Sequence, residues 1–194
     1  MTSLVDRLLE LDKIICGDNI TELRKLDDSI IDLTVTSPPY GNLRDYKGYS
    51  FDFENLAKEL FRVTKDGGVV VWVVGDSVIK GKNGGTTESG TSFKQALYFK
   101  EIGFNLHDTM IYSKKGASLP DKTRYFQKFE YMFIFSKGTP KTINLIKDRK
   151  NKSVGKPKTT HSRDENTNEI IYYNTYITKE FGLRYNIWDI NEGY

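Results

Sequence analysis

The stretch Ile30-Ile-Asp-Leu-Thr-Val-Thr-Ser-Pro-Pro-Tyr40 is an apolar run that ends abruptly in two prolines. The run from Ile30 to Thr36 predicts a strand of a sheet. Pro38 and Pro39 cannot donate to a sheet ladder, so the strand must end before them, and they hold Ser37 in an extended conformation. The stretch therefore predicts a rigid rim at the carboxyl end of a strand, where open α/β sheets bind their ligands.

The segments on either side of this stretch alternate between strand and helix patterns. In chain order they are a buried strand at Lys13–Gly17, a helix capped by Asp18 or Asn19 and running to about Leu26, a helix from about Phe53 to Thr64, and a strand at Val69–Val74 after the break Asp66-Gly67-Gly68. The Val69–Val74 run is apolar on both faces, which is typical of a central parallel strand. This alternation predicts an α/β, doubly wound sheet.

The second half of the chain predicts a different type of strand pairing. Residues 81–90 are mostly Gly, Thr, Ser and Asn and predict a plain flexible loop rather than a phosphate site. A helix from Ser92 to about Ile102 follows, with Phe93, Ala96, Leu97 and Phe99 on its apolar face. Asn105–Ser113 and Phe129–Ser136 then predict two strands that pair antiparallel, because no helix separates them. Ile170–Ile177 predicts one more strand.

Composition limits the classes of protein that the chain can represent. It has 194 residues, with 38% hydrophobic and 28% charged, as expected of one globular domain. No apolar run is long enough to span a membrane, so no membrane partner is expected. Cys16 is the single cysteine, which fits a reducing, cytoplasmic location, and with only two histidines no metal site is expected.

Basic residues gather late in the chain. The formal net charge is only +3, which permits a nucleic-acid partner without requiring one. Lys147 to Arg163 is rich in Lys and poor in apolar residues, and it is a candidate arm for DNA phosphates. Its candidate contacts are Lys150, Lys152, Lys156 and Lys158, and the alternative is a solvated charged loop. We therefore divide the chain into a catalytic part, residues 1–138, and a basic segment for target recognition or DNA contact, residues 139–194.

The rim at Ser37–Tyr40 has residues suited to an amino-group substrate. The exocyclic amino nitrogen of cytosine or adenine is a poor nucleophile, because its lone pair is delocalised into the ring. The Ser37 hydroxyl and the Pro38 carbonyl could accept its two hydrogens and direct the lone pair toward an electrophilic methyl group. Tyr40 could stack on the base, which must leave the duplex to reach such a site. A Ser-Pro-Pro turn without function is the alternative.

Several segments together resemble the DNA amino-methyltransferases of restriction–modification and orphan bacterial systems. The similar segments are Lys13–Asp18, Asp28–Tyr40, Asn42–Tyr46, Arg62–Trp72 and Glu130–Gly138, in the order of that family. The resemblance implies a Rossmann-like methyltransferase sheet, S-adenosyl-L-methionine as cofactor and double-stranded DNA as substrate. It also implies catalytic roles for Ser37, Pro38, Pro39 and Tyr40 and cofactor contacts by Asp18, Asn19, Thr36 and Ser37. Asp18 as a simple helix cap is the alternative. Arg44 is a candidate DNA contact, and the alternatives are that it orders the loop after the motif or pairs with Asp45 at the surface.

One element of that family is absent from the sequence. No Asp-Pro-Phe-x-Gly-x-Gly turn, which binds the methionine end of the cofactor, occurs between Met1 and Tyr194. In the permuted class, with the Ser-Pro-Pro-Tyr motif first, this segment lies on the C-terminal side and supplies two strands beside the Ile30–Thr36 strand. We therefore expect an incomplete sheet with an unpaired edge, and a truncated or split enzyme that needs a complementing C-terminal half or second subunit. A naturally degenerate fragment is the alternative.

Three functional hypotheses follow from these features. The leading one is methylation of DNA, with cytosine N4 favoured over adenine N6 because Ser at position 37 is commoner among the cytosine-N4 members. The second is N-methylation of RNA or of a protein amide. The third is a non-catalytic nucleic-acid-binding or assembly fragment, motivated by the missing cofactor segment.

Overall fold

A computed structural model describes residues 12–39, 51–118 and 123–190, including the backbone but not the side chains of residues 117–118. The chain divides into two compact units. The first contains the described residues up to Thr142 together with residues 186–190, and the second is Ile143–Tyr185.

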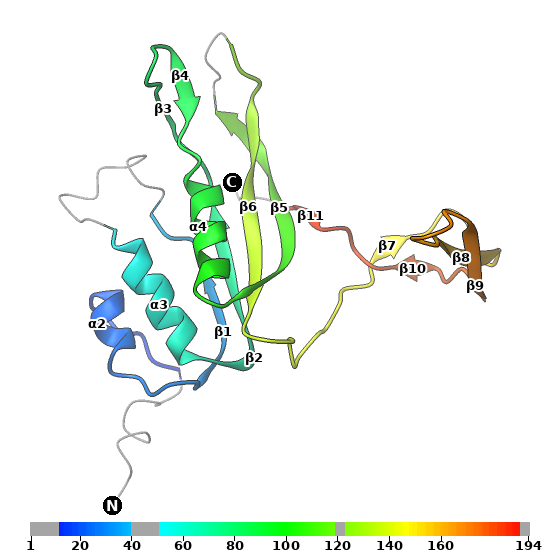
Figure 1. The fold of residues 1–194 in the computed structure, drawn as a ribbon, viewed down its shortest axis with the longest axis horizontal. Helices are drawn as coiled ribbons and strands as arrows, with labels where there is room; N and C mark the ends of the chain where they lie inside the picture. Colours follow the sequence, from blue (N-terminus) through cyan, green and yellow to red (C-terminus); the bar gives the residue numbers. More distant parts are fainter. Residues whose placement is uncertain (1–11, 40–50, 119–122, 191–194) are drawn as a thin grey trace, which may run out of the picture. The chain divides into compact units, whose positions relative to one another are not determined.

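A five-stranded mixed sheet forms the first unit (Figure 1). Its order is β1-β2-β6-β5-β11, with bounds β1 Ile31–Thr36, β2 Thr64–Val74, β6 Gln127–Ser136, β5 Asn105–Ser118 and β11 Ile187–Asp189. β1 pairs parallel with β2 and β11 parallel with β5, whereas β6 pairs antiparallel with both β2 and β5. The predicted α/β class, with parallel strands and an antiparallel pair near residues 105–136, is confirmed.

Three described helices belong to the first unit, and the core lies between the sheet and the longer two. These helices are α2 Asn19–Leu23, α3 Phe53–Val63 and α4 Thr91–Glu101. Leu56 and Leu60 of α3 and Phe99 of α4 pack with Val70 and Trp72 of β2 in one buried cluster. The predicted apolar face of α3 is confirmed. Both longer helices therefore cover the same face of the sheet, the one that the even-numbered residues of β2 line.

The buried face of α4 differs from the predicted one. Phe93 and Leu97 are 50% and 65% exposed, whereas Ser92, Gln95, Ala96 and Phe99 are buried. Gln95 turns toward the core because its side-chain oxygen accepts a hydrogen bond of 2.9 Å from the indole N–H of the buried Trp72. A satisfied amide can be buried at low cost, so the helix is rotated by one position from the face that hydrophobicity predicts.

β2 also starts earlier than the sequence indicates. The strand begins at Thr64, directly after α3, and passes through Gly67 and Gly68 rather than starting after them. Ile31 pairs with Thr64 but Leu33 with Val69, so the glycine pair lies in an irregular stretch with extra residues on β2. Gly67 has a φ of +82°, a conformation that favours glycine, which explains how the ladder continues through this bulge.

The predicted buried strand at Lys13–Gly17 is wrong. These residues form no strand, Ile14 and Ile15 are 101% and 62% exposed, and Cys16 is exposed as well. A strand needs a neighbour for its hydrogen bonds, and no described strand pairs with this segment. The predicted helix that follows is present but shorter, as α2, with Asp18 as its N-cap.

The predicted flexible loop at residues 81–90 is part of a β-hairpin. β3 (Val78–Lys80) and β4 (Thr86–Glu88) pair antiparallel with three residue pairs in register. Gly84 and Gly85 have φ angles of +85° and +71° and supply the tight reversal between the strands. Composition alone predicted a flexible loop here and did not indicate the short ladder on both sides of the reversal.

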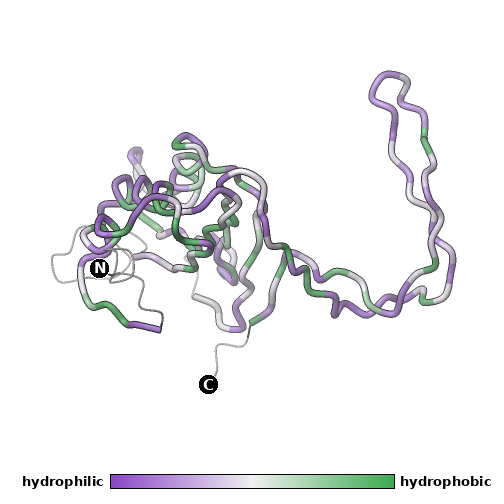
Figure 2. The backbone as a smooth tube through the Cα atoms, turned by 90° about the horizontal axis from the view of Figure 1, so that it is seen from below, coloured by the Kyte–Doolittle hydropathy of each residue, from purple (hydrophilic) through white to green (hydrophobic). Residues whose placement is uncertain are grey.

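The second unit consists of two separate strand pairs. β7 (Arg149–Lys150) pairs with β10 (Phe181–Gly182), and β8 (Pro157–Arg163) pairs with β9 (Ile170–Ile177). The predicted strand at Ile170–Ile177 is confirmed. Every residue of β8 and β9 is exposed. No residue of Ile143–Tyr185 is buried, so this unit has no hydrophobic core of its own. Figure 2 shows hydrophilic and hydrophobic positions interspersed along the chain.

Candidate active site at the carboxyl edge of the sheet

The rim predicted from the prolines lies at the carboxyl end of β1. Thr36, the last residue of β1, pairs with Trp72 of β2, so the parallel strands β1 and β2 end at the same edge of the sheet. Ser37 is exposed, Pro38 is buried and Pro39 is half-buried. Tyr40 and Arg44 lie outside the described residues. The two strands thus bring Ser37-Pro38-Pro39 and Gly75-Asp76-Ser77 to the edge at which open α/β sheets bind ligands.

Asp76 is a buried carboxylate at this edge and fixes the start of α4. One of its oxygens accepts a hydrogen bond of 3.2 Å from the backbone N–H of Ser92 and one of 2.8 Å from the Ser89 hydroxyl. Its other oxygen accepts from the Ser92 hydroxyl. A carboxylate at a helix N-terminus satisfies N–H groups that have no partner within the helix. Asp76 therefore acts as a positioning residue that holds α4 against the carboxyl edge.

An aromatic group surrounds Tyr131 of β6 near the same edge. Tyr131 pairs with Val74, the last residue of β2. The rings of Phe93 and Phe129 contact its ring edge-on, with centroids 5.3 and 5.4 Å away, and both are partly exposed. Burial raises the pKa of the Tyr131 phenol, and the nearby carboxylates of Asp76 and Glu88 raise it further. The phenol therefore remains a neutral hydrogen-bonding group at physiological pH.

The aromatic residues around Tyr131 were not among the site residues predicted from the sequence. The signal was present in the alternation of Phe129, Tyr131, Phe133 and Phe135, because side chains two apart on a strand share one face. The partner on α4, Phe93, could not be found in this way, since its contact with Tyr131 spans two separate elements.

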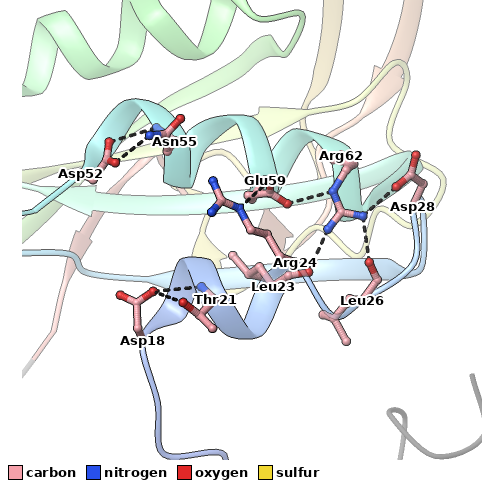
Figure 3. A network of polar contacts seen from close by, with 10 residues as sticks. All are labelled: Asp18, Thr21, Leu23, Arg24, Leu26, Asp28, Asp52, Asn55, Glu59 and Arg62. Atoms are coloured by element: carbon pink, nitrogen blue, oxygen red, sulfur yellow. Dashed lines mark hydrogen bonds and ion pairs between the residues drawn. The ribbon is translucent and has the colours of Figure 1, made fainter. Parts of the chain in front are cut away.

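Among the residues assigned to the cofactor, Asp18 has a local structural role. Its carboxylate accepts hydrogen bonds from the backbone N–H of Thr21 at 2.9 Å and from the Thr21 hydroxyl at 2.8 Å (Figure 3). These bonds lower the pKa of Asp18. Asn19 is the first residue of α2 and is exposed. The cap that the sequence offered as the alternative for Asp18 is present, and a cofactor contact by Asp18 stays a prediction.

Arg62, near the C-terminal end of α3, joins α2 and the turn before β1 to α3 (Figure 3). Its guanidinium donates to the carbonyl oxygens of Leu23 and Leu26, each at 2.8 Å, and forms ion pairs with Asp28 and Glu59. The hydrogen bond to Asp28 is the main cause that raises the pKa of Arg62. Because Asp28 precedes β1, this network sets the position from which β1 enters the sheet.

The four lysines predicted to contact DNA lie in the second unit, and all are exposed: Lys150, Lys152, Lys156 and Lys158. Ile143–Tyr185 holds nine Lys or Arg residues and five Asp or Glu residues, so the positive charge of the chain is concentrated there. Of these, Arg184 and Asp148 form an ion pair with each other, which lowers the pKa of Asp148.

The described part of the chain has no group of three His, Cys, Asp or Glu that could hold a metal ion.

The strand order and the helix-covered face define a Rossmann-like methyltransferase fold. TTHA0409 of Thermus thermophilus, solved in complex with S-adenosyl-L-methionine, matches 66% of this chain and 55% of its own, with a TM-score of 0.51 and 23% identity. The cytosine-N4-specific PvuII DNA methyltransferase matches 68% of this chain and 50% of its own, with a TM-score of 0.50 and 22% identity. At these identities the two matches establish the fold alone.

The chain belongs to the DNA methylase family of N6 and N4 amino-methyltransferases, whose model matches residues 31–192. The orphan methyltransferase M.BamHII of Bacillus amyloliquefaciens is 60% identical over 171 residues, which are 87% of this chain and 63% of that protein. The chain thus spans less than two thirds of the length of this curated relative. The resemblance that the sequence motifs indicated is confirmed at the level of the family.

Among the described residues the longest helices have 11 residues, and none could cross a membrane.

Proposed function

We propose that this chain transfers a methyl group from S-adenosyl-L-methionine to the exocyclic amino group of a base in double-stranded DNA. The observation that carries the proposal is the Ser37-Pro38-Pro39 rim at the carboxyl end of β1, in a chain of the DNA methylase family. We favour cytosine N4 over adenine N6 as the target, on the basis of the serine at position 37.

The chemistry assigned to the rim follows from its residues. When bound, S-adenosyl-L-methionine supplies an electrophilic methyl group on a sulfonium sulfur. The Ser37 hydroxyl and the Pro38 carbonyl accept hydrogen bonds from the amino group of the target base, which directs the nitrogen lone pair toward that methyl carbon. In the transfer the N–C bond would form as the methyl carbon's bond to sulfur breaks, leaving the neutral thioether S-adenosyl-L-homocysteine, and the amino nitrogen would release one proton to solvent. Because Pro38 is buried and both prolines have fixed φ angles, Ser37 is held in place for this step.

The described residues fit the methyl donor only in part. Thr36 and Ser37 lie at the carboxyl edge, but the Asp18 carboxylate is already engaged by Thr21. Among the described strands β1 is terminal in the sheet, and its Leu33 and Val35 are 58% and 65% exposed. An apolar strand with an open edge is suited to pair with another strand. We therefore propose that a complementing segment or second subunit completes the sheet and the cofactor site.

The DNA contacts of the second unit are part of the proposal. Lys150, Lys152, Lys156 and Lys158 are exposed and would neutralise phosphates without reading the sequence. Arg44, which lies outside the described residues, is also proposed to contact DNA.

One experiment tests the function. Duplex DNA is incubated with cofactor labelled on the methyl group and with the chain, in the presence and absence of a segment that supplies the missing Gly-rich turn, and the DNA is digested to nucleosides. N4-methylcytosine is the expected product, and N6-methyladenine would correct the base while keeping the class of reaction. Absence of label from both mixtures would contradict the proposal and favour a DNA-binding fragment.

Isothermal titration with the cofactor tests whether a complementing segment is needed. Tight binding of the cofactor by the chain alone would contradict the need for such a segment.

A further inference from the structure

Two hairpins of the first unit stand at the edge of the sheet where β1 ends (Figure 1). The β3–β4 hairpin follows the carboxyl end of β2, and the outer parts of β5 and β6 extend beyond the Val74–Tyr131 pair at which β2 ends. Arg124, just before β6, joins the two hairpins, because its guanidinium donates to the carbonyl of Thr86 at 2.6 Å and to its hydroxyl at 3.3 Å. We call the described residues 78–88, 113–118 and 123–130 the paired hairpins.

The paired hairpins are basic, whereas the rest of the first unit is not. They contain six Lys or Arg residues and two Asp or Glu residues, and one of the lysines, Lys114, is paired with Glu130. The other described residues of the first unit contain ten Lys or Arg residues against fourteen Asp or Glu residues. Lys80, Lys82, Lys115 and Lys128 are exposed, and within the described chain none of them takes part in an ion pair. A polyanion would therefore be attracted to this surface and repelled from the remainder of the unit.

Exposed aromatic rings are interleaved with these cations. Tyr125 is 99% exposed, Phe126 is 57% exposed and Phe129 is 38% exposed, and they lie between Arg124 and Glu130 on the approach to and start of β6. Phe129 also contacts Tyr131, so the series reaches the aromatic group at the carboxyl edge. Cations suit phosphates, and aromatic faces suit sugars and bases, so this combination fits a nucleic acid better than a neutral protein surface.

We propose that the paired hairpins are a second DNA-contacting surface, in addition to the lysines of Ile143–Tyr185, at the carboxyl edge of the sheet where β1 ends before the Ser37 rim. This inference rests on the proposed function, since it takes DNA as the substrate. Lys80 and Lys82 on one hairpin and Lys115 and Lys128 on the other contact backbone phosphates. Tyr125 and Phe126 pack against the nucleotides next to the target base. The surface thus holds the duplex at the rim rather than reading its sequence.

The test is the salt dependence of duplex binding by the full chain, measured by fluorescence anisotropy without cofactor. The slope of log K against log salt is negative, and each lost phosphate contact reduces its magnitude by about 0.9. We expect the double variants Lys80→Gln/Lys82→Gln and Lys115→Gln/Lys128→Gln each to reduce the magnitude of the slope by about 2 units. Tyr125→Ser is expected to weaken binding about fivefold with an unchanged slope, because it removes stacking but no charge.

The matched control is Lys58→Gln/Lys100→Gln, which removes two exposed lysines from α3 and α4 and is expected to leave the slope unchanged. All variants replace exposed side chains, and thermal melts verify that they fold. If the wild-type chain binds DNA but the hairpin variants keep its slope, the inference is wrong while the proposed function stands. If hairpin variants reduce the magnitude of the slope but no methylated nucleoside forms in the product assay, the surface is supported and the proposed catalysis is not. Failure of the wild-type chain to bind duplex DNA would overturn the inference.

Discussion

At the scale of single residues, Ser37 combines exposure with a fixed backbone. The residue follows the last ladder position of β1 and precedes the buried Pro38, so its side chain is accessible while its main chain is constrained. This combination suits a hydroxyl that must accept a hydrogen bond from an amino group in one defined direction.

Replacing Ser37 with Ala is therefore expected to lower the methyl-transfer turnover about 100-fold, the size of effect typical for loss of one well-placed hydrogen-bonding group in an active site. The duplex affinity should change less than twofold. Turnover is measured on duplex DNA with the complementing segment supplied. Ser77→Ala is the matched control, since Ser77 lies at the same edge and its backbone carbonyl, which the substitution keeps, accepts a hydrogen bond from Ser89. Equal turnover in wild type and Ser37→Ala would remove Ser37 from the reaction.

Tyr131 gives a prediction for pH. Burial raises its pKa above the ordinary value of 10.0, so the unfolded chain loses this proton at lower pH than the folded chain does. The contribution of Tyr131 to stability is therefore complete below about pH 10 and declines as the pH rises from there through its folded pKa. Urea unfolding is measured at pH 9 and at pH 11. Between these two pH values Tyr131→Phe should lose less free energy of unfolding than wild type does. The same loss in both proteins would contradict the assignment.

At the scale of elements, Arg62 determines how α2 and the turn before β1 are held. Hydrogen bonds to charged groups contribute about 1.5–3 kcal/mol each when partly buried, and Arg62 makes several across three segments. The Arg62 side chain is 29% exposed, so part of that contribution is screened by solvent. The helix itself is short, with five residues, and would be marginal without such a tertiary anchor.

Arg62→Ala is expected to lower the free energy of unfolding by about 1–3 kcal/mol. It should also raise the hydrogen-exchange rates of residues 19–26, because the carbonyl of Leu23 at the end of α2 and that of Leu26 in the turn after it each lose a donor. Lys58→Ala on the exposed side of the same helix is the control, with an expected change below about 0.5 kcal/mol. If exchange in residues 19–26 matched wild type, α2 would be anchored by Ile20 and Leu23 alone.

At the scale of the whole molecule, the open edge of the sheet is the feature with the largest consequence. β1 carries the Ser37 rim and at the same time ends the described strand order, with Leu33 and Val35 exposed on one face. Central strands of such sheets are normally covered on both sides, and an apolar edge promotes pairing between chains. The strand most important for the proposed reaction is therefore also the strand most in need of a partner.

This predicts that the chain self-associates through β1 when no complementing segment is supplied. Sedimentation velocity at micromolar concentrations should show dimers or larger species. Leu33→Lys/Val35→Lys should shift the population to monomer, because charges on an edge strand oppose pairing. Val154→Lys, at an exposed apolar position of the second unit, should not. Association that persists in Leu33→Lys/Val35→Lys would show that another surface drives it.

Local sequence was sufficient wherever a constraint lies within a few residues. Pro38 and Pro39 end β1 by their covalent geometry, Asp18 caps α2 within one turn, and the apolar spacing of Leu56, Leu60 and Val63 determines the buried face of α3. Only the tertiary structure decided the features that depend on a partner distant in the chain. Gln95 is buried because Trp72 donates to it, the two hairpins meet because Arg124 reaches Thr86, and Lys13–Gly17 forms no strand because no described strand pairs with it. The physical reason is that hydrogen-bond partners and burial are set by neighbours in space, which the periodicity of one segment does not specify.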